Sequence, residues 1–223
     1  MRALVVGASG GIGGALCAAL AQRGQVVGLS RSVDGLDVTD EASVARVLGA
    51  LQPEFDLVFV ATGALVLNGQ GPEKTLRALD PAVIASQFAL NAIGPMLVLK
   101  HALRLMPKDR PADRPVRFAA LSARVGSIGD NALGGWYSYR AAKAALNQFL
   151  HTAAIEVTRS HRQSVVLALH PGTVETGLTA VHGAGHPTVT PAEAAANLLA
   201  VLDATTPADT GQFLDWAGKR VAW

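Results

Sequence analysis

Ala3-Leu4-Val5-Val6-Gly7-Ala8-Ser9-Gly10-Gly11-Ile12-Gly13 is the stretch of this chain that decides its fold. The apolar run at its start predicts a strand buried on both faces, as in a parallel sheet. An alanine-rich helical pattern follows over 12–22, and Gly24 marks its end. A glycine turn between a strand and a helix lets the backbone approach a pyrophosphate, and the helix start offers free N–H groups. The turn therefore predicts a dinucleotide phosphate site formed by Gly7, Ser9, Gly10, Gly11, Ile12 and Gly13.

Strands and helices alternate along the rest of the chain. We expect further strands at 25–30, 36–38, 56–61, 116–121, 164–169 and 212–215. We expect helices at 41–51, 81–106, 137–159 and 191–202, the second of them bent near Gly94-Pro95. This alternation predicts one α/β domain over 1–223, with a doubly wound, mostly parallel sheet of about seven strands and helices on both faces. Ligands bind outside the carboxyl ends of the strands in such sheets.

Composition excludes several classes of function. The 223 residues are half hydrophobic and carry a formal net charge of +2 without a run of Lys or Arg, so we expect no nucleic-acid partner. Cys17 is the single cysteine, which excludes an internal disulfide, and the six histidines form no His-Glu-x-x-His pattern, so we expect no metal site. Apolar runs are broken by Gly, Pro or charge before the ~18 residues of a membrane span. We expect a cytoplasmic protein with no membrane partner.

The end of the second strand bears on the choice of cofactor. An acidic residue at this position would bind the ribose 2′-hydroxyl of NAD, whereas here Ser30 and Arg31 leave room and positive charge for a 2′-phosphate. The pair favours NADP(H), with NAD(H) possible. The alternative is that Arg31 is only a solvated loop residue.

Tyr139 and Lys143 are four residues apart in the predicted helix 137–159, so both side chains lie on one face of it. A neighbouring ammonium favours the phenolate, and we expect it to lower the pKa of Tyr139. The pair could then donate or accept a proton near neutral pH. The alternative is an accidental pair on a helix surface.

Several short motifs recur in one order from residue 7 to residue 176. Gly7, Gly11 and Gly13 match the Gly-x-x-x-Gly-x-Gly turn of the short-chain dehydrogenase/reductase family, and Tyr139 with Lys143 matches its Tyr-x-x-x-Lys signature. Further segments resemble the family's adenine, Asn-Ala-Gly, helix-bending Asn and nicotinamide motifs: Asp37-Val38, Ala61-Thr62-Gly63, Asn91-Ala92-Ile93-Gly94-Pro95 and Pro171-Gly172-Thr173-Val174-Glu175-Thr176. Segments 126–128, 134–137 and 211–216 resemble the C-factor-like and sniffer-type carbonyl reductase branch.

The resemblance implies a Rossmann fold and an enzyme that interconverts a small-molecule carbonyl and an alcohol with NADP(H). It implies that Tyr139 is the general acid/base, that Lys143 holds the nicotinamide ribose hydroxyls and that Asn91 anchors a proton-relay water. These three residues would also border the cofactor, together with Ser30, Arg31, Asp37, Val38, Ala61, Thr62, Gly63, Pro171, Gly172, Val174 and Thr176. Helices 81–106 and 137–159 pair across subunits in this family, which implies a homodimer or homotetramer.

One departure from the family concerns the catalytic serine after the fifth expected strand. Ala123 occupies the register where the family has that serine, and Ser122 lies one residue earlier. Because successive strand side chains point to opposite faces, Ser122 can replace the usual hydroxyl only if the strand has already ended or bulged. Ser127 is a second candidate, and the absence of any catalytic serine is a third possibility.

Two further expectations remain open at the level of sequence. The glycine-rich segment 175–190 is a candidate substrate lid. The alternative to an enzyme is a dinucleotide-binding sensor or signalling protein with weak or vestigial reductase activity, which the substitution at Ala123 and the C-factor resemblance both motivate.

Overall fold

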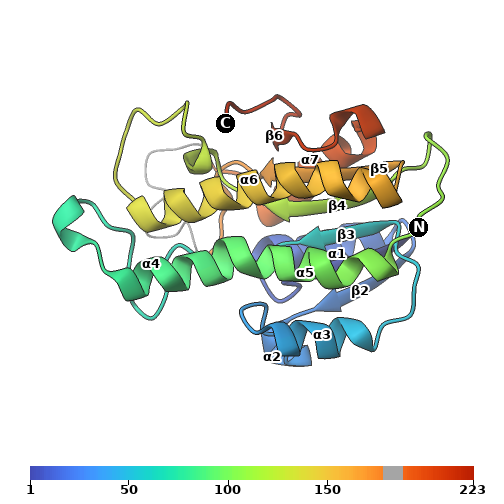
Figure 1. Cartoon of the computed structure of the whole chain (residues 1–223), viewed down its shortest axis with the longest axis horizontal. Coiled ribbons are helices and arrows are strands. Elements are labelled where there is room, and N and C mark those ends of the chain that lie inside the picture. The colour runs from blue at the N-terminus through green and yellow to red at the C-terminus, as the bar shows by residue number, and fades with distance from the viewer. Residues whose placement is uncertain (178–187) are drawn as a thin grey trace.

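A computed structural model describes residues 1–177 and 188–223. Its centre is a six-stranded sheet with the order β2-β1-β3-β4-β5-β6, in which every neighbouring pair is parallel (Figure 1). The strands are β1 (Arg2–Val6), β2 (Gln25–Leu29), β3 (Leu57–Val60), β4 (Val116–Leu121), β5 (Ser164–His170) and β6 (Phe213–Asp215). The predicted parallel α/β fold is confirmed.

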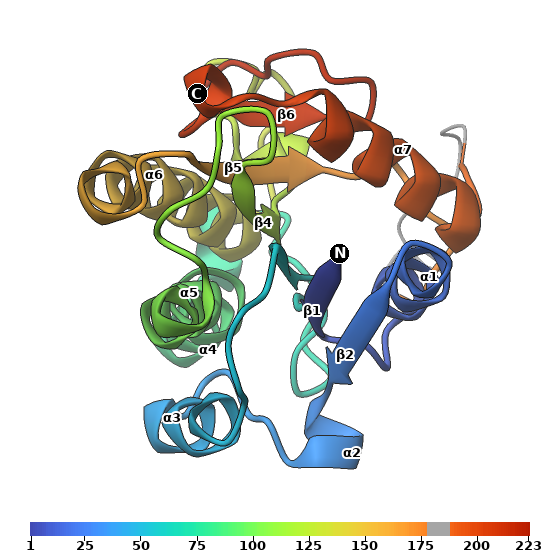
Figure 2. The same ribbon diagram turned by 90° about the vertical axis from the view of Figure 1, so that its right-hand side faces the viewer.

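Helices cover both faces of the sheet, as Figure 2 shows. One face carries α1 (Gly11–Ala21) and α7 (Pro191–Ala204), while the other carries α3 (Glu41–Gly49), α5 (Gly94–Ala102) and α6 (Tyr137–Ser160). Short helices complete the chain: α2 (Arg31–Asp34) and the 3-10 turns Leu76–Ala78, Leu103–Leu105, Arg124–Gly126 and Pro207–Asp209.

Alternate residues of each strand supply two hydrophobic cores. In β1, Leu4 and Val6 pack with the cluster under α3, α5 and α6, whereas Ala3 and Val5 pack with the cluster under α1 and α7. This is why the strands read as continuous apolar runs in the sequence, since both faces are buried. The two cores hold the carboxyl ends of the strands, and the loops that follow them, at one edge of the sheet.

The predicted strand at 36–38 is absent, so the sheet has six strands rather than seven. Leu36 N donates to Ser30 O, and Asp37 N donates to Ser43 Oγ, so these backbone groups have local partners instead of a neighbouring strand. The side chains of Leu36 and Val38 are nevertheless buried. Their apolar pattern reflects burial in a loop against the core, which a periodicity of two cannot distinguish from a short strand.

The predicted bend near Gly94-Pro95 takes the form of a π-helical turn. α4 (Pro81–Phe88) continues through the π turn Ala89–Ile93 into α5 without a break. The sequence predicts that Gly94 and Pro95 break this apolar run, but the helix continues through them. By length and composition the continuous stretch Pro81–Leu105 could cross a membrane. Its side chains Val98, Leu99 and Ala102 are buried in the core, and a core helix of a soluble protein passes the same test.

Candidate functional site

The site lies where the strand order reverses direction, at the carboxyl ends of β1 and β3. Gly7 directly follows β1 with φ +95°, and a Cβ at this residue would lie 2.9 Å from the carbonyl carbon of Ala61. The glycine turn and Ala61-Thr62-Gly63 therefore touch, as two predicted cofactor segments must. Thr62 and Gly63 continue toward Asn91 and Lys143, since a Cβ on Gly63 would lie 3.0 Å from Asn91 Oδ1 and 3.3 Å from Lys143 Nζ.

The phosphate turn has the close contacts that only glycine permits. A Cβ on Gly13 would lie 2.1 Å from Gly7 O, and one on Gly11 would lie 2.9 Å from Thr176 Cγ2. Gly10 is the N-cap of α1 and provides no side chain to cap it, so Ser9, Gly10, Gly11 and Ile12 surround an open helix start. This cradle fits a pyrophosphate, which backbone N–H groups and the helix dipole would bind.

The predicted adenosine contacts lie beyond β2. Ser30 is buried, and its Oγ accepts from Val33 N, so this hydroxyl caps α2. Arg31 is exposed and is the first residue of α2, two residues after β2 ends. The half-buried Asp37 accepts hydrogen bonds on its carboxylate from Thr39 Oγ1 and from Thr39 N, and these two hydrogen bonds, that of the hydroxyl most, lower its pKa. It is therefore ionised at neutral pH, and the next residue, Val38, is buried.

The predicted nicotinamide segment follows β5. Gly172 has φ +81°, and a Cβ there would lie 3.1 Å from Trp216 Cδ1, so the C-terminal segment packs directly behind it. Val174 pairs with Val189 in a parallel bridge. The contact of Thr176 with Gly11 brings this segment to the phosphate turn. The proposed lid at 175–190 lies largely outside the described residues, because 178–187 are not described.

Tyr139 and Lys143 are both buried on the sheet-facing side of α6. Lys143 Nζ lies 5.7 Å from the centroid of the Tyr139 ring and donates to Leu121 O at 2.8 Å. Burial lowers the pKa of Lys143 to about 7, and burial raises the pKa of Tyr139 to about 12. The expected lowering of the Tyr139 pKa is therefore wrong for this structure, because desolvation dominates and the ammonium hydrogen-bonds to a backbone carbonyl rather than to the phenol.

Asn91 occupies the centre of the π turn and is fully buried. Its Oδ1 accepts from Ala64 N at 3.2 Å, while its Nδ2 donates to Ala64 O at 2.9 Å and to Gln87 Oε1 at 2.6 Å. The side chain therefore fixes the loop that carries Gly63 beside Lys143. The distances place Asn91 in the same cluster as Lys143, as its motif predicted.

Ser122 does not join this cluster. Its N donates to Leu169 O, which continues the β4–β5 pairing, and Ala123 is still extended with φ −150°. Although β4 ends at Leu121, the backbone stays extended through Ala123, and the Ser122 hydroxyl donates to Asn147 Oδ1 at 2.6 Å. Asn147 is eight residues beyond Tyr139 in α6, which is about 12 Å along the helix axis. The prediction that Ser122 faces the substrate beside Tyr139 is thus contradicted by the orientation of its side chain.

Ser127 is likewise occupied, because its Oγ accepts from Asp130 N at 3.0 Å and the residue is buried. Sequence reasoning missed Asn147, although its position four residues after Lys143 places it on the same helical face. It also missed Glu73, a buried carboxylate that contacts the start of α6 at Ser138. No sequence motif marks Glu73, because it lies 65 residues from its partner.

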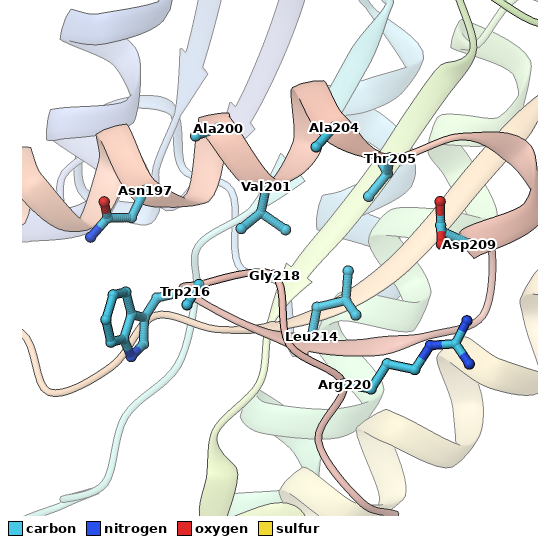
Figure 3. Close-up of a pocket in the computed structure, with 11 residues that line it drawn as sticks. Asn197, Ala200, Val201, Ala204, Thr205, Asp209, Leu214, Trp216, Gly218 and Arg220 are labelled. Carbon is cyan, nitrogen blue, oxygen red and sulfur yellow. The ribbon is translucent and has the colours of Figure 1, made fainter.

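The cavity in Figure 3 is separate from this cluster. It has a volume of about 420 Å³ and lies between α7 and the C-terminal segment. Trp216 lines one end of it and, on its other side, packs against Gly172. None of the predicted cofactor or catalytic residues among the described residues lines this cavity.

Known proteins resemble this chain over nearly its full length. A family model described as enoyl-(acyl carrier protein) reductase matches residues 7–215. A 1-hydroxy-2-glutathionyl-2-methyl-3-butene dehydrogenase of Rhodococcus sp. (strain AD45) is 31% identical and aligns over 99% of this chain and 98% of its own. C-signal of Myxococcus xanthus is 32% identical over 74% of this chain and 96% of its own.

A solved structure agrees with the fold described above. It is a short-chain dehydrogenase/reductase of Burkholderia multivorans with bound NADP, 25% identical to this chain, with a TM-score of 0.80. The alignment covers 100% of this chain and 99% of the other. Because sequence and structure both match from the glycine turn to the last strand, this protein is an oxidoreductase of the short-chain dehydrogenase/reductase family.

Proposed function

We propose that this protein is an NADP(H)-dependent oxidoreductase that interconverts a small-molecule carbonyl and its alcohol. The observation that carries the proposal is the convergence of Tyr139, Lys143 and Gly63 at the edge where the glycine turn opens α1. A proton donor and a dinucleotide cradle then border the same space. NAD(H) remains a possible second cofactor.

Different segments of this chain would bind different parts of NADPH. The backbone of the turn from Gly7 to Gly13 and the start of α1 would bind the pyrophosphate. Ser30 and Arg31 would bind the 2′-phosphate, while Asp37 and Val38 would border the adenine. Ala61, Thr62 and Gly63 would line the middle of the cofactor, and Pro171, Gly172, Val174 and Thr176 would cover the nicotinamide.

When bound, NADPH supplies the hydride for the carbonyl carbon. Tyr139 donates the proton to the oxygen that becomes the alcohol, and its raised pKa of about 12 keeps this proton on the phenol at neutral pH. Lys143 would hold the nicotinamide ribose hydroxyls, and in its protonated form its ammonium would stabilise the developing alkoxide. Asn91 fixes the loop at Ala64 and supports the resupply of the proton through water.

In this arrangement neither candidate serine hydroxyl is available to hydrogen-bond the substrate carbonyl. Ala123 has no hydrogen-bond donor on its side chain, and the hydroxyls of Ser122 and Ser127 contact other groups. We propose that Tyr139 both polarises and protonates the carbonyl. Removing one oxyanion donor typically costs about 10²-fold in turnover, so we expect modest rates unless the substrate supplies its own activation.

The substitution Tyr139→Phe tests the proposal. It removes the proton donor while keeping the ring, so we expect loss of NADPH-dependent carbonyl reduction with unchanged NADPH binding. Turnover is followed by NADPH absorbance over a panel of aldehydes, ketones and quinones, and binding by calorimetry. Tyr137→Phe is the matched control, since it removes the other tyrosine hydroxyl of the chain. Near-normal turnover of Tyr139→Phe would refute the assignment.

A dinucleotide sensor or signalling protein is the second candidate function. Ala123 favours it, because a cofactor-binding site without a full set of carbonyl-polarising groups can bind NADPH without efficient chemistry. Tight NADPH binding with no turnover over the whole panel would support the sensor. Measurable turnover that Tyr139→Phe abolishes would support the enzyme.

We also propose that the protein forms a homodimer or homotetramer through α4, α5 and α6. Phe149 and Ile155 of α6 are 43% and 57% exposed, and Ile93 of the π turn is 44% exposed. These side chains provide apolar area on the outer sides of the two long helices, where a second copy would cover them.

A further inference from the structure

We propose that Glu73 is a positioning residue that holds the start of α6 and thereby aims the phenol of Tyr139. The inference deepens the proposed function and rests on it for its kinetic consequence. Glu73 lies in the connection between β3 and α4, which Figure 1 shows beside the N-terminal end of α6. It therefore reaches the catalytic helix from a distant part of the chain.

The turn that enters α6 is strained. Gly134, Gly135 and Trp136 have φ values of +66°, +64° and +53° in succession. Trp136 is the N-cap of α6 and provides no side-chain cap hydrogen bond. A non-glycine residue in the left-handed region is energetically unfavourable and persists only where surrounding contacts hold it. Contacts from elsewhere in the chain must therefore stabilise this turn.

Glu73 supplies such contacts on both sides of the helix start. Its carbonyl oxygen accepts from Trp136 N at 2.6 Å. Its carboxylate accepts from Ser138 N at 3.2 Å and from the Ser138 hydroxyl. Glu73 is only 6% exposed, and a buried carboxylate needs such donors. It thus takes the place of a local N-cap for the 24-residue helix, at the end where the helix dipole favours negative charge.

Arg140 holds the opposite side of the same turn. Its guanidinium donates to Gly134 O, Gly135 O and Val125 O at 3.2, 2.9 and 3.2 Å. The two charged side chains thus bind the backbone immediately before and within the first turn of α6. Tyr139 follows the Glu73 partner Ser138 directly, and its ring meets that of Trp136 edge-on, with centroids 6.4 Å apart. The orientation of the phenol therefore depends on the Glu73 contacts.

The test compares Glu73→Ala, Glu73→Gln and Asp40→Ala. Glu73→Ala removes every side-chain contact, whereas Glu73→Gln keeps an acceptor of the same length for Ser138. Asp40→Ala removes the N-cap of α3, whose Oδ1 accepts from Ala42 N at 3.0 Å, and so matches the loss of a helix cap away from α6. Each variant is assayed for melting temperature, NADPH dissociation constant, kcat and KM.

We expect Glu73→Ala to lower kcat about 10²-fold with little change in NADPH affinity, because a small displacement of a reacting group is enough. Glu73→Gln should restore most of kcat. Asp40→Ala should lower the melting temperature and keep kcat. Equal kcat in Glu73→Ala and Asp40→Ala at similar melting temperatures would overturn the proposal, as would a Glu73→Gln variant no better than Glu73→Ala.

Trp136 fluorescence provides a readout that does not need turnover. In a Trp216→Phe, Trp223→Phe background, Trp136 is the remaining tryptophan. We expect its emission to shift to longer wavelength in Glu73→Ala and to return in Glu73→Gln. An unchanged emission overturns the positioning role even if the protein reduces no carbonyl. A shifted emission in a protein without turnover supports the positioning role of Glu73, while the proposed function fails.

Discussion

Lys143 shows how burial decides the chemistry of a single residue. It is 2% exposed, its ammonium donates a hydrogen bond to Leu121 O, and burial lowers its pKa to about 7. Tyr139 beside it keeps its proton well above neutral pH for the same reason. A lysine that costs stability is retained where its charge serves a reaction, since buried ionisable groups concentrate at functional sites.

The buried lysine predicts a pH-dependent stability. Between pH 7 and 10.5 the unfolded chain binds a proton at Lys143 that the folded chain does not, so this residue makes stability rise with pH in that window. Below pH 7 its burial penalty is fully present. Lys143→Met should therefore raise the free energy of unfolding at pH 6 relative to the original protein, and this gain should shrink by pH 9.

Urea unfolding without cofactor at pH 6, 7.5 and 9 measures this difference. The window stays below pH 10 because Tyr139, with its raised pKa, makes stability fall as pH rises from 10 to 12. A difference between the two proteins that is independent of pH would contradict the burial of a titrating Lys143.

Arg31 predicts cofactor preference at the same scale. A charge-assisted hydrogen bond is worth about 1.5–3 kcal/mol, so Arg31→Ala should weaken NADPH binding by about 10- to 100-fold while leaving NADH binding unchanged. Calorimetric titration with both cofactors measures this. Arg159→Ala, an exposed arginine at the far end of α6, is the control. Equal weakening of NADPH and NADH binding would show that Arg31 does not bind the 2′-phosphate.

At the scale of elements, the start of α1 is built for close approach. Gly13 packs its Cα against the Gly7 carbonyl, so that strand end, turn and helix form one rigid unit. The π turn around Asn91 likewise holds the loop after β3 in place, because it directs the asparagine side chain toward the backbone of Ala64 instead of toward solvent. These elements place the cofactor residues through backbone geometry more than through side-chain chemistry.

Gly13→Ala tests the rigid unit. Its Cβ would lie 2.1 Å from Gly7 O, so the turn must open, and we expect a loss of about 1–3 kcal/mol in unfolding free energy together with weakened NADPH binding. Gly49→Ala in α3 is the control, because its Cβ meets nothing within 4 Å. That variant should gain about 0.5–1 kcal/mol. Urea unfolding of both proteins checks the two signs, and a neutral Gly13→Ala would contradict the structure.

At the scale of the whole molecule, the sheet order places every functional loop at one edge. The long helices α4–α5 and α6 run side by side on one face of the sheet (Figures 1 and 2). Phe149 and Ile155 of α6 are exposed apolar side chains. The same helices therefore serve the core on one side and, in our proposal, a second subunit on the other.

The assembly proposal predicts the effect of charge on that surface. The double substitution Phe149→Glu, Ile155→Glu should convert the oligomer to a monomer at micromolar concentration, because two carboxylates would have to be buried in the interface. Sedimentation velocity measures the mass. Val33→Glu, at an 80% exposed position in α2, should leave the assembly intact. A monomeric original protein would contradict the proposal.

The order of residues alone was enough to predict the alternation of strands and helices, the glycine turn, the bend at Asn91 and the Tyr139–Lys143 pair. These features depend on neighbours within a few residues, so periodicity and spacing reveal them. The extra strand at 36–38 was predicted wrongly because local hydrogen bonds to Ser30 and Ser43 replaced a sheet partner.

Which groups those residues contact depends on the packing of the folded chain. This packing turned the Ser122 hydroxyl to Asn147, joined Lys143 to Leu121 O, and brought Glu73 to Ser138. Each partner lies 22 to 65 residues away, and burial of each pair depends on how the helices pack on the sheet. Hydrogen-bond orientation and desolvation therefore follow from the folded chain, whereas the pattern of the elements is already present in the order of the residues.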